Sequence, residues 1–69
     1  MVEIFKTDIR DSKQSESIIN QLMELFPMWK INFDLEDADN ILRVEAEHIS
    51  LQTIIELLNK NGFKAEIII

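Results

Sequence analysis

The chain has 69 residues, of which 46% are hydrophobic, and it contains one glycine, one proline and no cysteine. This length makes a single domain over residues 1–69, and the composition excludes a disordered or low-complexity chain. The lack of cysteine excludes disulfides, thiolate metal sites and cysteine nucleophiles.

Acidic residues outnumber basic residues by 13 to 7, which gives a net charge of −6. That balance disfavours nucleic acid and anionic membranes, because both are bound through Lys and Arg. It favours cations or a basic protein partner, or simply solubility. The opening "MVEIFKTDIR" has neither the basic segment nor the apolar core of a secretory signal, and no apolar run reaches the ~20 residues that span a bilayer. We therefore expect a cytoplasmic protein.

Residues 1–7 have extended character, but their imperfect alternation leaves open which face is buried. Residues 15–26 carry the apolar stripe of an amphipathic helix, which Pro27 helps to end. The members of that stripe are Ile18, Ile19, Leu22, Met23 and Phe26.

The clearest alternation lies in "WKINFDLE", residues 29–36, and predicts a strand buried on one face. The Asp and Asn residues of "DADN" suit a turn. The following "ILRVEAE", residues 41–47, alternates again and predicts the second strand of a hairpin.

Ser50 is placed as the N-cap of a second helix, with Ile49 and Ile54 as its hydrophobic staple. Gly62 stands where the end of that helix favours a left-handed residue. The stripe of this helix comprises Leu51, Ile54, Ile55 and Leu58. The closing "FKAEIII" predicts a strand that buries Phe63, Ala65, Ile67 and Ile69.

The predicted order is β-α-β-β-α-β. Two amphipathic helices both bury their stripes only against a common sheet face. With right-handed crossovers, this order predicts an α+β, ferredoxin-like sandwich: a four-stranded antiparallel sheet with both helices on one face.

The stretch "LQTIIELLNK" followed by "NGFKAEI" resembles the closing helix and strand of the heavy-metal-associated domains, which are found in copper chaperones and metal-transporting ATPases. "LFPMWKINFDLEDADNILRVEAE" is similar to the middle of these domains, where Leu-Pro precedes a strand, Asp-Leu, a turn and a second strand. The resemblance covers essentially the whole chain and implies the same fold.

The family's metal site is Cys-x-x-Cys, and counting back from Pro27 at the family's usual separation places those cysteines at Ser12 and Ser15. The family's methionine, two residues before the first cysteine, falls near Arg10. Serine hydroxyls are hard, neutral ligands that suit Cu(I) poorly. The resemblance therefore implies a relative without metal binding, and we expect no metal and no cofactor.

The polar run "DIRDSKQSES" has a simpler interpretation as the cap of the first helix. Asp11 or Ser12 accepts the first amides, and Gln14 comes close to completing a capping box. A nucleophilic serine needs a base and an oxyanion site, whereas the lone His48 is expected at the opposite end of the fold. We therefore expect no enzyme.

A metal site with oxygen or imidazole ligands is the first alternative. Its ligands would come from the acidic turn and the lone histidine: Asp34, Glu36, Asp37, Asp39 and His48. The turn lacks the central Gly and terminal Glu of an EF-hand, and a single imidazole makes no zinc site. A solvated hairpin turn and an exposed histidine are the competing interpretation.

The last strand is expected at a sheet edge, with Ile68 directed away from the core and Ile41 on the same outer face. Such an edge is a template for strand addition or dimerisation, and the competing interpretation is a frayed terminus. The leading hypothesis is a non-catalytic interaction or regulatory module, which uses this edge and the surface around Arg10 and Lys13. Its partner would be an unidentified protein or a second copy, and a small-molecule sensor is the other alternative.

Overall fold

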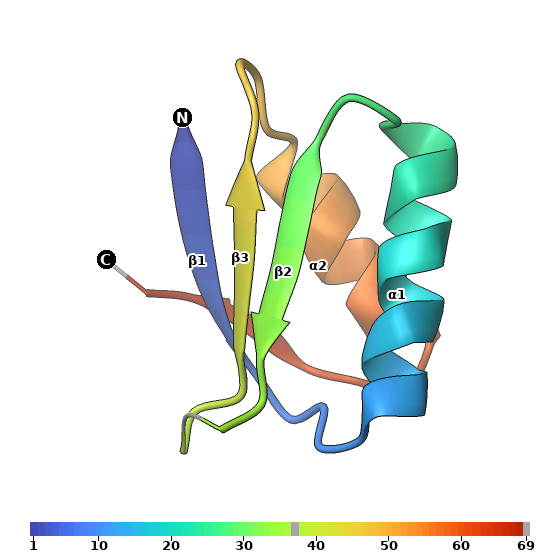
Figure 1. Ribbon diagram of the computed structural model, residues 1–69, viewed down its shortest axis with the longest axis vertical. Coiled ribbons are helices and arrows are strands. Elements are labelled where there is room, and N and C mark those ends of the chain that lie inside the picture. Colours follow the sequence, from blue (N-terminus) through green and yellow to red (C-terminus); the bar gives the residue numbers. More distant parts are fainter. Residues whose placement is uncertain (37, 69) are drawn as a thin grey trace.

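The computed structural model describes residues 1–36 and 38–68. Within them the chain forms two helices and a four-stranded antiparallel sheet, an α+β architecture (Figure 1). The elements follow one another as β1 (Val2–Thr7), α1 (Ser12–Leu25), β2 (Lys30–Asp34), β3 (Ile41–Glu45), α2 (Leu51–Lys60) and β4 (Ala65–Ile67). Two predictions fall on residues outside the described ones: Ile69 on the buried face of the last strand, and Asp37 as a metal ligand.

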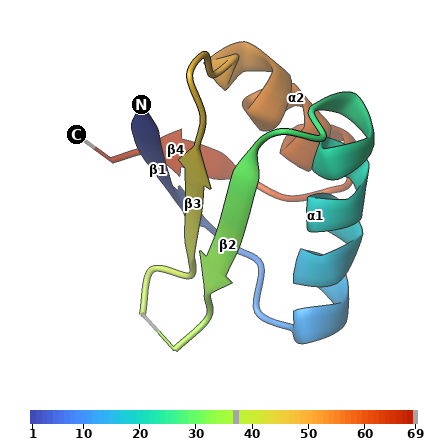
Figure 2. The same cartoon turned by 45° about the horizontal axis from the view of Figure 1, so that its top comes forward.

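The strands lie in the order β2-β3-β1-β4, and each neighbouring pair is antiparallel. Helix α1 contacts β2 and α2, while α2 contacts β4. Figures 1 and 2 show both helices on the same side of the sheet. The opposite side, which we call the open face, carries no helix in the described part of the chain.

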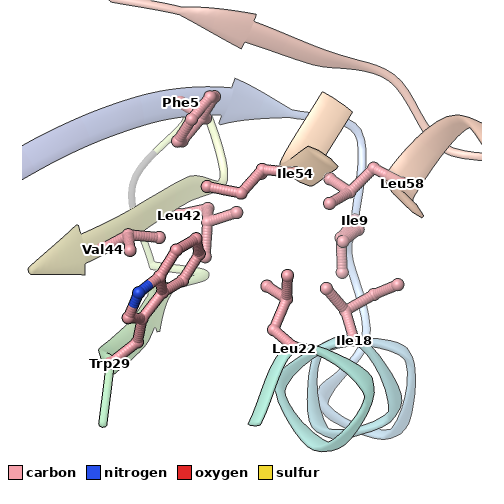
Figure 3. Close-up of a cluster of buried hydrophobic side chains, with 9 residues drawn as sticks. All are labelled: Phe5, Ile9, Ile18, Leu22, Trp29, Leu42, Val44, Ile54 and Leu58. Atoms are coloured by element: carbon pink, nitrogen blue, oxygen red, sulfur yellow. The ribbon is translucent and has the colours of Figure 1, made fainter. Parts of the chain in front are cut away.

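The core lies between the sheet and the two helices, and Figure 3 shows side chains from both layers pointing into it. Nine hydrophobic side chains are buried there: Phe5, Ile9, Ile18, Leu22, Trp29, Leu42, Val44, Ile54 and Leu58. Apolar residues at alternate strand positions and at helical spacing meet in one cluster, so the periodicities predicted the main buried positions correctly.

The open question about the first strand is decided by its neighbours. Phe5 and Thr7 are buried, whereas Val2 and Ile4 stand on the open face. Phe5 lies opposite Leu42 of β3 and Ile67 of β4, so three core-facing side chains share one row of the sheet.

Helix α1 corrects one prediction. It begins at Ser12, because Asp11 caps it, and a polar first turn precedes the apolar stripe. Met23, predicted in the buried stripe, is exposed, while Ile18 and Leu22 carry the burial. The set of buried residues on α1 is therefore narrower than the apolar stripe predicted from the sequence.

The ends of α2 confirm two predictions. The Ser50 hydroxyl accepts from the Thr53 amide at 3.4 Å. Gly62 adopts φ +88°, its amide donates to the Asn59 carbonyl, and the Phe63 amide donates to the Leu58 carbonyl. These two bonds form a Schellman motif, in which glycine supplies the left-handed residue.

Candidate interaction surface

The first turn of α1, where the resemblance places the family's cysteines, is a helix cap. Asp11 Oδ1 accepts from the amides of Lys13 at 2.7 Å and Gln14 at 3.2 Å, which confirms the cap prediction for Asp11. Ser15 is buried, and its hydroxyl donates to the Ser12 carbonyl at 2.9 Å, while Ser12 is exposed. The serine hydroxyl at position 15 therefore bonds its own helix.

The loop before α1 is tied to two other loops. The Thr7 hydroxyl donates to the Asn40 carbonyl at 2.7 Å and accepts from the Ile9 amide at 3.2 Å. Asp8 Oδ1 accepts from the Lys64 amide at 2.8 Å. Ile9 is completely buried between these contacts, which the polar character of the run concealed.

The acidic turn bonds within itself and to β1. Asp34 Oδ1 accepts from the Glu36 amide at 3.2 Å, and Asp39 pairs with Lys6 at 3.5 Å. Asn40 takes φ +48°, a conformation that asparagine tolerates in turns. The carboxylates of Asp34 and Asp39 therefore both make contacts within the fold.

His48 is exposed in the loop after β3, whereas the acidic turn precedes β3, so the two lie at opposite ends of that strand. Among the described residues, no three His, Asp or Glu side chains are grouped so that they could hold a metal ion. The structure therefore does not group the described members of the predicted ligand set, Asp34, Glu36, Asp39 and His48.

An exposed apolar cluster occupies the part of the open face formed by β1 and β4. Ile68 donates its amide to the Ile4 carbonyl at 2.9 Å, so these side chains stand opposite each other. Val2 lies two positions from Ile4 on the same face. Their exposed fractions are 45% for Val2, 37% for Ile4 and 40% for Ile68. We call these three residues the edge patch.

The other predicted interaction residues lie apart from the edge patch. Ile41 is on the open face but is half-buried, opposite Lys6 and diagonal to Ile4. Arg10 and Lys13 are exposed, Arg10 in the loop between β1 and α1 and Lys13 in the first turn of α1. The structure therefore supports Ile68 as part of a patch and places Arg10 and Lys13 outside it.

A hollow of about 900 Å³ opens at the other end of the molecule. It is lined by Phe26, Met28 and Trp29 from the connection between α1 and β2, and by His48 and Ile49 from the loop after β3. The rings of Phe26 and Trp29 stack with centroids 3.8 Å apart, and Met28 is 89% exposed. This end hollow was not predicted from the sequence, although apolar residues on both sides of Pro27, in a loop between helix and strand, were a signal for it.

The comparisons with known proteins give no relative: no protein-family model matches the chain, and no curated protein matches it significantly. Neither helix of the described residues has the length and apolar content needed to cross a membrane.

Proposed function

We propose that the protein is a small non-catalytic interaction domain of the ferredoxin-like class, related to the heavy-metal-associated domains but without their thiolate metal site. The chain order of the elements and the sheet order β2-β3-β1-β4 support the fold assignment. The loss of metal binding is supported by Ser12 and Ser15 at the family's cysteine positions and by the hydroxyl of Ser15 bonding its own helix.

The interaction takes place at the outer edge of β4. The observation that carries this proposal is the edge patch, where exposed apolar side chains stand directly beside an edge strand. An added strand would gain backbone hydrogen bonds from β4, and its side chains on the open face would lie beside Ile68.

Selection of short peptides by display on the immobilised protein tests this binding mode directly. We expect selected peptides to be extended, with alternating apolar residues, and to shift the NMR signals of the Ala65 and Ile67 amides. Ile68→Lys should weaken this binding about tenfold or more, because it places a charge within the apolar contact.

Asn32→Lys is the matched control, because Asn32 is also exposed on the open face but belongs to β2 at the opposite edge. It should leave peptide binding unchanged. Peptides that bind equally well to Ile68→Lys, or that shift only residues of the end hollow, would contradict the proposal.

The end hollow favours a second candidate function, the binding of a small molecule. Its size falls within the range of ligand pockets, and its walls combine aromatic and thioether groups with a few polar ones. Trp29 is the only tryptophan and it lines this hollow, so a ligand bound there should change the tryptophan fluorescence. A library of small apolar acids and amines that leaves this fluorescence unchanged at millimolar concentration would eliminate this candidate.

A further inference from the structure

The strand at the outer edge has a sequence that complements itself. In the described part of the chain no strand lies beyond β4. We propose that this edge pairs with the same edge of a second copy of the chain, in an antiparallel register centred on Ala65. The inference rests on the proposed function, because it names the partner of the same edge.

The backbone of β4 has the direction that such pairing needs. The Ile68 amide donates to Ile4, and the Lys64 amide donates to Asp8 Oδ1, so both point toward β1 and its loop. Backbone groups alternate in direction along a strand. Those of Ala65 and Ile67 are therefore directed to the outer edge, where a second strand would meet them.

The side chains from Phe63 to Ile67 are, in chain order, apolar, basic, small, acidic and apolar. An antiparallel partner centred on Ala65 places Lys64 opposite the second copy's Glu66, and by symmetry Glu66 opposite its Lys64. Phe63 then lies opposite the second copy's Ile67. Directly opposed charges of opposite sign and apolar cross-strand pairs stabilise antiparallel strands. Two-fold symmetry repeats each contact.

Charge selects this register over its neighbours. Centring the pair on Glu66 would place the two Glu66 carboxylates directly opposite each other, which is destabilising. Centring it on Ile67 would place each Glu66 opposite the second copy's Ile68, so the Glu66 carboxylate would face no opposite charge. Lys64 and Glu66 are both exposed on the outer face, so both are accessible for the Ala65 register.

The same arrangement would reduce the solvent exposure of Ile68, one of the three residues of the edge patch. Ile68 would lie just beyond the paired residues, beside the second copy's helix-ending turn at Gly62 and near its Lys64. The aliphatic stem of a lysine covers apolar surface while its ammonium group stays in water. The pairing thus accounts for an exposed isoleucine beside a lysine and a glutamate.

The other edge strand, β2, has a similar charge pattern but a different setting. Its terminal charges, Lys30 and Asp34, would also be opposed in an antiparallel pair centred on Asn32. Lys30, however, pairs with Glu45 at 3.8 Å, and Asp34 accepts from the amide of Glu36. Helix α1 contacts β2 and flanks its outer side in both ribbon views (Figures 1 and 2), so two α1 helices would meet there.

Charge reversal tests the register in the full chain. Sedimentation of the wild type should show a concentration-dependent dimer. Lys64→Glu and Glu66→Lys should each raise the dimer dissociation constant at least about tenfold, because each opposes like charges twice. An equimolar mixture of the two variants should associate again as a heterodimer, since every opposed pair then has opposite signs.

The corresponding reversals on β2, Lys30→Glu and Asp34→Lys, are the matched controls and should leave the dimer intact. The inference is overturned if the wild type stays monomeric at millimolar concentration, if mixing fails to restore association, or if the β2 variants abolish it. If the wild type is monomeric but still binds display peptides at Ala65 and Ile67, only the self-pairing proposal is wrong. If it neither dimerises nor binds such peptides, the proposed function is wrong as well.

Discussion

The two halves of the open face differ in chemistry although they belong to one sheet. The half formed by β2 and β3 is polar, and its charges pair within the chain: Glu45 contacts both Lys30 at 3.8 Å and Arg43 at 3.6 Å. The half formed by β1 and β4 carries the edge patch. Natural proteins protect edge strands with charge, and among the described residues the ion pairs of an edge strand are found at β2. The difference indicates that the β4 side is the side adapted for contact.

The largest expected effect is a difference in unfolding free energy between substitutions on the two faces of β1. Phe5→Ala should lower the free energy of unfolding by about 3–5 kcal/mol, because it leaves a cavity in the core. Ile4→Ala, one residue away on the open face, should cost about 1 kcal/mol or less. Urea denaturation measures both. Equal losses would show that the edge patch holds the fold together rather than serving contact.

The next effect concerns the link between β1 and the hairpin. Thr7→Val should cost about 1–3 kcal/mol, because it leaves the Asn40 carbonyl and the Ile9 amide without the hydroxyl that both contact. Thr7→Ser keeps the hydroxyl and should cost clearly less. If both variants unfold at the same urea concentration, the hydroxyl contributes nothing to the link.

A smaller effect on stability but a clear effect on the surface is expected from the edge patch. The double change Ile4→Thr and Ile68→Thr should keep the unfolding midpoint close to wild type, since threonine suits strands. It should reduce the fluorescence of a hydrophobic dye by about half, because exposed apolar patches bind such dyes. Asn32→Thr, in the polar half, should leave the dye signal unchanged, and an equal drop there would erase the contrast between the halves.

The smallest effect belongs to the polar half. Lys30→Ala removes the ion pair with Glu45, but the Lys30 side chain is 78% exposed. Exposed ion pairs contribute little, so the change in unfolding free energy should stay below about 0.5 kcal/mol. A loss above 1 kcal/mol would mean that these charges stabilise the sheet as well as covering its edge.

The sequence predicted the elements whose signals are local. Strand alternation, the Asp11 and Ser50 caps and the left-handed Gly62 each depend on residues a few positions apart, and all are present in the structure. The candidate site was predicted in part. Ile68 is exposed at the edge as expected, whereas Arg10 and Lys13 belong to the loop before α1 and to its first turn.

The rest depends on partners that are distant in the chain. The sequence by itself determined the helices, the strands and which side chains alternate, because these follow from local geometry. Only the tertiary structure decided that Phe5 faces the core and Ile4 faces outward, that Ile9 is buried within a polar run, and that Ile68 stands against Ile4. Register and burial arise from contacts between residues up to 64 positions apart, such as the Ile68–Ile4 bond, and no local pattern encodes them.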